Sequence, residues 1–230
     1  MVNILHKNII EKMNETPLVF DGAMGTMIYE KGVFVNACYD ELNLVNPKLI
    51  KSIHQEYVDA GCDVILTNTF GANKFKLEKY GLANKLFEIN FEGVKIAREI
   101  APDNVYTIAS VGPCIARGKS LTVENIDSLK ENYEIQMKAL SEAGADGVMF
   151  ESHYNLEEID IASTIAKKYN LPTIASLACK KEHETLNGLN IKKAISILDK
   201  NKNIDSIALN CIVGPHAMLS LVEETINLTS

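Results

Sequence analysis

The sequence alternates short apolar runs with longer segments of helical spacing, and this alternation constrains the fold more than any other feature. The runs are rich in Val and Ile, and each ends in a polar residue or a glycine. They cover residues 17–20, 63–66, 105–109, 147–150, 173–175 and 206–209. Continuous apolar runs of this kind are typical of strands buried on both faces of a parallel sheet. The pattern therefore predicts six β/α units and an α/β fold.

Capping residues mark where the helical segments begin and end. Asn46 followed by Pro47 is typical of a helix start, and Gly61 is typical of the end of the same helix. A second helix start is predicted at Asn155, which stands three residues before a glutamate in a variant of the capping box. A third is predicted at Pro215, directly after a glycine.

Two architectures fit this pattern, an open doubly wound sheet and a (β/α)8 barrel. Barrel active sites collect side chains from the carboxyl ends of many strands, and polar residues follow most of the predicted strands here. These residues are Asp21, Asn68, Thr69, Gly112, Glu151, Asn210 and Cys211. Residues 21–26 hold two glycines but match neither common phosphate-loop pattern, which an open sheet often carries. The barrel is favoured, with about six of its eight units in this chain.

Charge and composition exclude several classes of partner. The 230 residues include 30 acidic and 23 basic side chains, a net charge of −7, and only Arg98 and Arg117 are arginines. Phosphate recognition needs a basic face and favours arginine, so we expect neither nucleic acid nor an anionic membrane surface as a partner. No run of about 18 apolar residues predicts a membrane-spanning helix.

The cysteines and the first residues indicate where the protein works. Five cysteines are scattered along the chain without a CxxC pair, which is typical of reduced thiols in the cytoplasm. Residues 1–12 are too interrupted by polar side chains for a secretory signal, and their spacing predicts a short amphipathic helix. No linker divides the sequence, so we expect one domain over residues 1–230.

Each polar strand end also has a simpler explanation. An aspartate before a glycine, as at Asp21, is most often a turn or cap residue. Cys211 after an apolar strand is on general grounds a buried structural thiol. Glu151 is harder to explain in this way, because a carboxylate beside an apolar strand is costly to bury without a partner. Together these residues predict two carboxylates, amides, hydroxyls and a thiol at one edge of the fold.

Five motifs resemble those of the homocysteine S-methyltransferase domain family, in order and spacing. They are residues 21–26 (DGAMGT), 67–73 (TNTFGAN), 110–113 (SVGP), 150–152 (FES) and 209–215 (LNCIVGP). Within the family the chain is most similar to the N-terminal domain of cobalamin-dependent methionine synthases and of bacterial homocysteine methyltransferase–methylenetetrahydrofolate reductase fusions. The resemblance implies a (β/α)8 barrel and a methyltransferase that moves a methyl group to the thiolate of homocysteine, forming methionine.

The resemblance also implies a zinc ion that activates the thiolate. The family binds zinc through one cysteine after the sixth strand and a tandem pair after the eighth. Cys211 corresponds to the first of these, whereas the tandem pair is absent from the sequence. We therefore expect a domain that is incomplete at its C-terminus, with the last two β/α units and the other two zinc ligands beyond residue 230. This leaves the activity of the chain alone in doubt.

The remaining assignments follow from the same resemblance. Asp21 and Glu151 are expected to bind the substrate ammonium, and Gly22, Asn68 and Thr69 are candidates for its carboxylate. Cobalamin or folate would act only through other domains or partners that supply the methyl donor. The alternative is a non-catalytic remnant or scaffold of the same fold without zinc. A third reading, an aldolase-type barrel, would need a Schiff-base lysine or a phosphate site at a strand end, and neither is evident.

Overall fold

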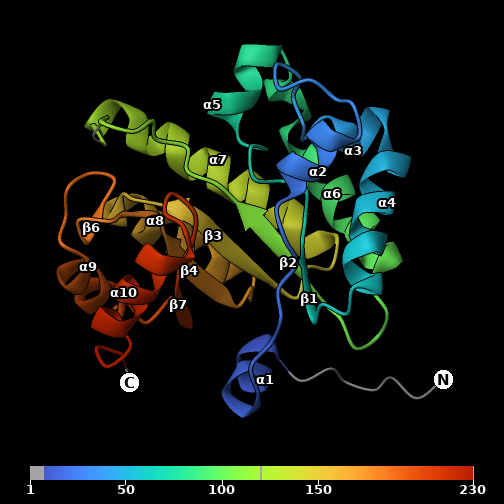
Figure 1. Ribbon diagram of the computed structural model, residues 1–230. Coiled ribbons are helices and arrows are strands. Elements are labelled where there is room, and N and C mark those ends of the chain that lie inside the picture. The colour runs from blue at the N-terminus through green and yellow to red at the C-terminus, as the bar shows by residue number, and fades with distance from the viewer. Residues whose placement is uncertain (1–7, 120, 230) are drawn as a thin grey trace.

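A parallel five-stranded sheet forms the centre of the computed structural model, which describes residues 8–119 and 121–229 (Figure 1). Its strands lie in the order β1-β2-β3-β4-β7. They are β1 (Val64–Leu66), β2 (Tyr106–Val111), β3 (Gly147–His153), β4 (Thr173–Leu177) and β7 (Ser206–Leu209). All neighbours pair in parallel, and the sheet does not close on itself within the described residues.

Five of the six predicted strands are confirmed, and the first is reduced to a single contact. Phe20 forms one isolated parallel bridge with Val64, so residues 17–20 lie beside β1 without forming a regular strand. The hydrogen bond from the Asp21 N–H to the Val64 carbonyl (2.9 Å) continues this pairing by one residue. The chain order of a parallel barrel is therefore kept from Phe20 to β7, although the first strand is irregular.

Helices connect consecutive strands and cover the outside of the sheet (Figure 1). The longer ones are α4 (Pro47–Asp59), α6 (Leu86–Ile100), α7 (Val123–Glu142), α8 (Leu156–Lys168), α9 (Ile191–Leu198) and α10 (Pro215–Thr225). The predicted starts at Pro47 and Pro215 are confirmed. The Asn155 side chain accepts hydrogen bonds from the Glu157 and Glu158 N–H groups, which confirms the cap of α8.

Short elements that the periodicity did not predict lie over the carboxyl ends of the strands. They are α2 (Met24–Glu30), α3 (Leu42–Val45), α5 (Lys74–Leu77), η1 (Glu78–Tyr80) and η2 (Ala83–Lys85). A small antiparallel hairpin of β5 (Cys179–Lys180) and β6 (Glu184–Thr185) follows β4. These elements are too short for a hydrophobic period to develop, which is why sequence patterns missed them.

The amino ends of the strands are covered by α1 (Ile9–Glu15), at the bottom of Figure 1. Ile9 is buried in one apolar cluster with Val64, Ile108 and Ile174, from β1, β2 and β4. The predicted amphipathic helix is thus present over the residues that the structure describes, and residues 4 and 5 of that prediction lie outside them. No helix in the described part of the chain is long and apolar enough to cross a membrane.

Candidate functional site

A cavity of about 630 Å³ opens at the carboxyl ends of β1, β2 and β3. Of the residues singled out from the sequence, it is lined by Gly22, Asn68, Glu151 and Cys211. Ser110 and Ser152 contribute from β2 and β3, and residues 37–40 contribute from the loop before α3. Parallel strands end at the same edge of a sheet, so side chains that follow different strands meet there.

Asp21 is not part of the cavity lining but directly precedes Gly22, which is, and one of its carboxylate oxygens is unused. Its Oδ2 accepts a hydrogen bond of 2.9 Å from the Leu66 N–H. Its Oδ1 is buried and has no hydrogen-bond partner among the described residues. Burial, together with the nearby charge of Glu151, raises the pKa of Asp21 from 3.8 to about 7. A buried, unpaired acceptor next to a second carboxylate favours a bound cation.

Glu151 is held in place by side chains from the ends of β2 and β7. Its Oε2 accepts a hydrogen bond of 2.6 Å from the Ser110 hydroxyl, and its Oε1 accepts one of 3.4 Å from Asn210 Nδ2. The register of β3 against β4 shifts between Phe150 and His153, and Ser152 has a φ of +58°. This irregularity breaks the in-and-out alternation of the strand, so Glu151 and Ser152 both line the cavity.

Asn210 connects the ends of three strands at the cavity wall. Its Oδ1 accepts hydrogen bonds from the Ser152 N–H (3.1 Å) and the Ser176 hydroxyl (2.7 Å). Its Nδ2 donates to the Ser152 hydroxyl at 2.8 Å and lies 3.3 Å from Cys211 Sγ. The amide thereby orients both Glu151 and the thiol, a positioning role that the sequence did not assign.

Of the other predicted substrate residues, Gly22 and Asn68 line the cavity and Thr69 does not. Gly22 lines the cavity, and a Cβ at this position would stand 2.8 Å from the Tyr57 hydroxyl oxygen. Asn68 also lines it, with its Nδ2 donating to the Tyr39 carbonyl at 2.7 Å. Thr69 is fully buried and outside the lining, because its hydroxyl donates to the Ser110 carbonyl at 2.7 Å.

Cys211 is exposed at the cavity mouth, so its interpretation as a buried core thiol is wrong. It follows β7 in a left-handed conformation with a φ of +58°. Among residues 8–119 and 121–229, no three His, Cys, Asp or Glu side chains lie together as a metal site would need. A catalytic zinc takes three protein ligands, so the described residues do not form a zinc site by themselves.

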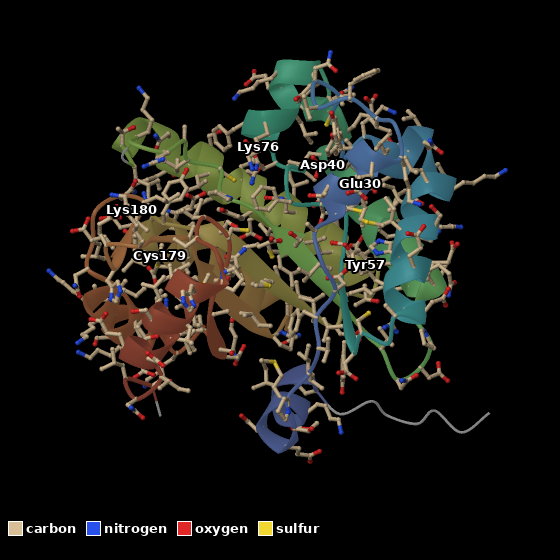
Figure 2. All side chains as sticks on the ribbon, viewed as in Figure 1. Glu30, Asp40, Tyr57, Lys76, Cys179 and Lys180 are labelled. Carbon is tan, nitrogen blue, oxygen red and sulfur yellow. The ribbon has the colours of Figure 1, made fainter. Side chains whose placement is uncertain are left out.

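Two residues of the cavity that carried no predicted role are Asp40 and Lys76 (Figure 2). Asp40 is buried, and its Oδ1 accepts a hydrogen bond of 2.8 Å from the Gly71 N–H. Burial raises the pKa of Asp40 to about 6, against the opposing charge of Lys76. Lys76 lies 4.3 Å from the centre of the Phe70 ring, and burial lowers its pKa. Neither residue lies in the five motifs, although the motif at residues 67–73 includes Gly71, whose N–H binds Asp40.

Comparison with known proteins agrees with the geometry. The profile of the family described as "Homocysteine S-methyltransferase" matches residues 18–230. The methionine synthase of Mycobacterium leprae (strain TN) is 27% identical over 229 residues, and that of Mycobacterium tuberculosis (strain ATCC 25618 / H37Rv) is 26% identical over the same length. Each alignment covers 92% of this chain, but only 19% of the longer relative.

Among solved structures, the fold is similar to the metallated form of the homocysteine methyltransferase MmuM from Escherichia coli. The TM-score is 0.82 at 19% sequence identity, and the match covers 95% of this chain and 83% of that one. At this level of identity the likeness shows the fold alone. It confirms the predicted barrel-type α/β architecture, whose sheet remains open between β1 and β7 in the described residues.

Proposed function

The chain belongs to the homocysteine S-methyltransferase family, and we propose that it binds homocysteine and transfers a methyl group to its sulfur, forming methionine. The observation that carries the proposal is the pair of carboxylates formed by Glu151, which lines the cavity, and Asp21, which directly precedes the lining residue Gly22. They are near enough for the charge of Glu151 to raise the pKa of Asp21. Two such carboxylates suit an amino-acid ammonium, which supplies one positive charge and three donors.

The hydrogen bonds around the pair support this orientation. Asp21 uses Oδ2 on the Leu66 N–H, which leaves Oδ1 for a donor on the ligand. Glu151 is fixed by Ser110 and Asn210 before any ligand arrives. In the proposal the ammonium lies between the two carboxylates, and Gly22 and Asn68 form the region that receives the substrate carboxylate, with Thr69 buried behind them. The substrate sulfur would then lie toward Cys211.

Zinc enters the proposal as the family's metal, which lowers the pKa of a bound thiol so that the sulfur can attack a methyl carbon. Cys211 is the one ligand that we assign in this chain. The described residues do not complete the site, so the other two cysteines would come from beyond residue 230. The competing function, a scaffold of the same fold without zinc, is favoured by the same single thiol.

The methyl donor is proposed to reach the site through another domain or protein of the methylcobalamin or methylfolate type. The similarity to two mycobacterial methionine synthases, and the greater length of these relatives, support this view. We further propose that residues 1–230 form one cytoplasmic domain and part of a barrel, since β1 and β7 remain outer strands in the described residues.

Calorimetric titration of the 230-residue chain with homocysteine tests the proposal. Asp21→Asn and Glu151→Gln should each weaken binding at least tenfold, because each removes a charged partner from a partly buried ammonium. Asp103→Asn is the matched control, since Asp103 is exposed and outside the cavity. Binding that is unchanged in both cavity variants would refute the assignment. A chain that binds homocysteine but shows neither zinc binding nor turnover, even when the two further β/α units of the family are supplied, would favour the scaffold function.

A further inference from the structure

A second cavity of about 470 Å³ lies next to the first. Its lining includes Lys76 in α5, Lys79 in η1 and Lys119 in the loop after β2. Lys76 and Lys79 line both cavities, so the two spaces adjoin across these side chains. A ligand in the second cavity would therefore lie beside the occupant of the first.

The lining of the second cavity is exclusively cationic among its charged groups. It contains three lysines and no aspartate or glutamate, although the whole chain carries a net charge of −7. Like charges that share a partly enclosed space repel one another. Burial is the main cause that lowers the pKa of Lys76, and the ammonium of Lys79 adds to it, against the opposing charges of Asp40 and Glu158. An arrangement of this kind is stabilised when an anion enters.

The nearest carboxylates, Asp40 and Glu158, act on Lys76 but lie outside the lining of the second cavity. Asp40 faces Lys76 from the first cavity. Glu158 lies buried behind the loop, where its Oε1 already accepts hydrogen bonds from the Cys114 N–H (2.6 Å) and the Tyr133 hydroxyl (2.9 Å). Lys79 and Lys119 form no ion pair within residues 8–119 and 121–229. Their ammonium groups are free to meet a ligand.

The remaining walls suit an organic ligand with a flat apolar part. Phe75 is half-buried, and Tyr154 is 9% exposed with its hydroxyl donating to the Ile115 carbonyl at 2.6 Å. Apolar walls exclude water and so strengthen the attraction between an ammonium and an anion. Asn125 also reaches the cavity, and its Oδ1 accepts from the Thr122 N–H, which leaves its NH2 group as a further donor.

We propose that the second cavity binds an organic anion that carries two or more carboxylate or phosphate groups, next to the homocysteine cavity. Its role as the anionic part of the methyl donor rests on the proposed function, whereas its binding does not. The three lysines supply the charge, Asn125 supplies a neutral donor, and the two aromatic rings supply the apolar wall.

Titration of the 230-residue chain with citrate and with inorganic pyrophosphate tests this proposal and distinguishes a carboxylate from a phosphate ligand. Lys119→Glu should weaken binding of the preferred probe about tenfold or more, because it replaces an attraction by a repulsion. Lys193→Glu on α9 is the matched control, since Lys193 is exposed and forms no ion pair among the described residues. Rising salt should weaken binding to the wild-type chain.

Three results would overturn the proposal: no binding of either probe, equal losses in both variants, or unchanged binding in Lys119→Glu. Equal losses would mean unspecific attraction to surface lysines. Homocysteine titrations of the same variants separate this test from that of the proposed function. Lys119 lines only the second cavity, so Lys119→Glu should keep its homocysteine affinity. A chain that binds the anion but not homocysteine would refute the proposed function and leave the anion site standing.

Discussion

Ser110 donates a hydrogen bond of 2.6 Å to Glu151 Oε2 and so ties the end of β2 to the end of β3 at the cavity wall. Ser110→Ala should weaken homocysteine binding about three- to tenfold, because Glu151 loses a charge-assisted hydrogen bond that orients it. The free energy of unfolding should fall by about 1 kcal/mol. Calorimetry and urea unfolding measure the two effects. Unchanged affinity despite a correctly folded variant would mean that this orientation does not matter for the ligand.

Asp21 should make the folded chain less stable as the pH rises from about 4 to about 7. Its pKa is raised from 3.8 to about 7, so the folded chain keeps a proton that the unfolded chain has lost. This contribution to stability is complete below pH 3.8 and is lost as the pH passes about 7. Urea unfolding of the wild type and Asp21→Asn should be measured at several pH values. As the pH rises, the free energy of unfolding of the variant should increase relative to that of the wild type.

The other titrating groups are present in both the wild type and Asp21→Asn, so their effects cancel in the difference between the two free energies of unfolding. Burial raises the pKa of Asp40 to about 6, in the same direction, and lowers the pKa of His54 to about 4, in the opposite direction. If the two stability curves run parallel from pH 4 to pH 8, Asp21 has an ordinary pKa in the folded chain.

Cys211→Ser should change neither the stability nor the zinc affinity of the 230-residue chain. The thiol is exposed. Among the described residues its polar contact is with Asn210 Nδ2 at 3.3 Å, and a serine hydroxyl can keep this contact. A single thiolate does not form a stable zinc site, which needs three or four ligands. Zinc competition against a chromophoric chelator measures the affinity. Loss of tightly bound zinc in the variant would show that other residues join Cys211 in solution.

Gly93→Ala should destabilise the fold by about 1–3 kcal/mol through overpacking. A Cβ on Gly93 in α6 would stand 2.5 Å from Thr69 Cγ2 and 2.7 Å from Asn43 Nδ2. Gly214→Ala is the control, because a Cβ there meets nothing within 4 Å. Thermal and urea unfolding of the pair decide the matter. Equal stability of the two variants would mean that the contact around Thr69 relaxes without cost.

The periodicity of the sequence predicted the sheet and the edge at which the site lies. Strands β1 to β4 and β7 occur where continuous apolar runs occur, because β1 to β4 are mostly buried and β7 is half-buried at the edge of the sheet. Glu151 and Cys211 follow such runs directly, so their place at the carboxyl edge could be read from their position alone. The presence of both in one cavity agrees with that reading, while their chemical roles stay predictions.

The direction of individual side chains could not be predicted in this way. Thr69 directly follows Asn68, yet it is buried in a hydrogen bond to Ser110, and only the packing of β1 against β2 decides this. Asp40 and Lys76 come from short elements without a period, and the bond from the Gly71 N–H to Asp40 joins residues 31 positions apart. Such contacts depend on tertiary structure, which local patterns do not contain.

The turn after β7 lowers the stability of the folded chain. Cys211 and Ile212 both adopt left-handed backbone angles, with φ of +58° and +66°. This costs an ordinary residue about 1–2 kcal/mol, and a β-branched residue such as isoleucine more. The Ile212 side chain is 59% exposed, so packing returns little of that cost. In a laboratory lineage selected only for heat resistance, Ile212→Gly would be an early gain, because glycine adopts a positive φ without a steric penalty.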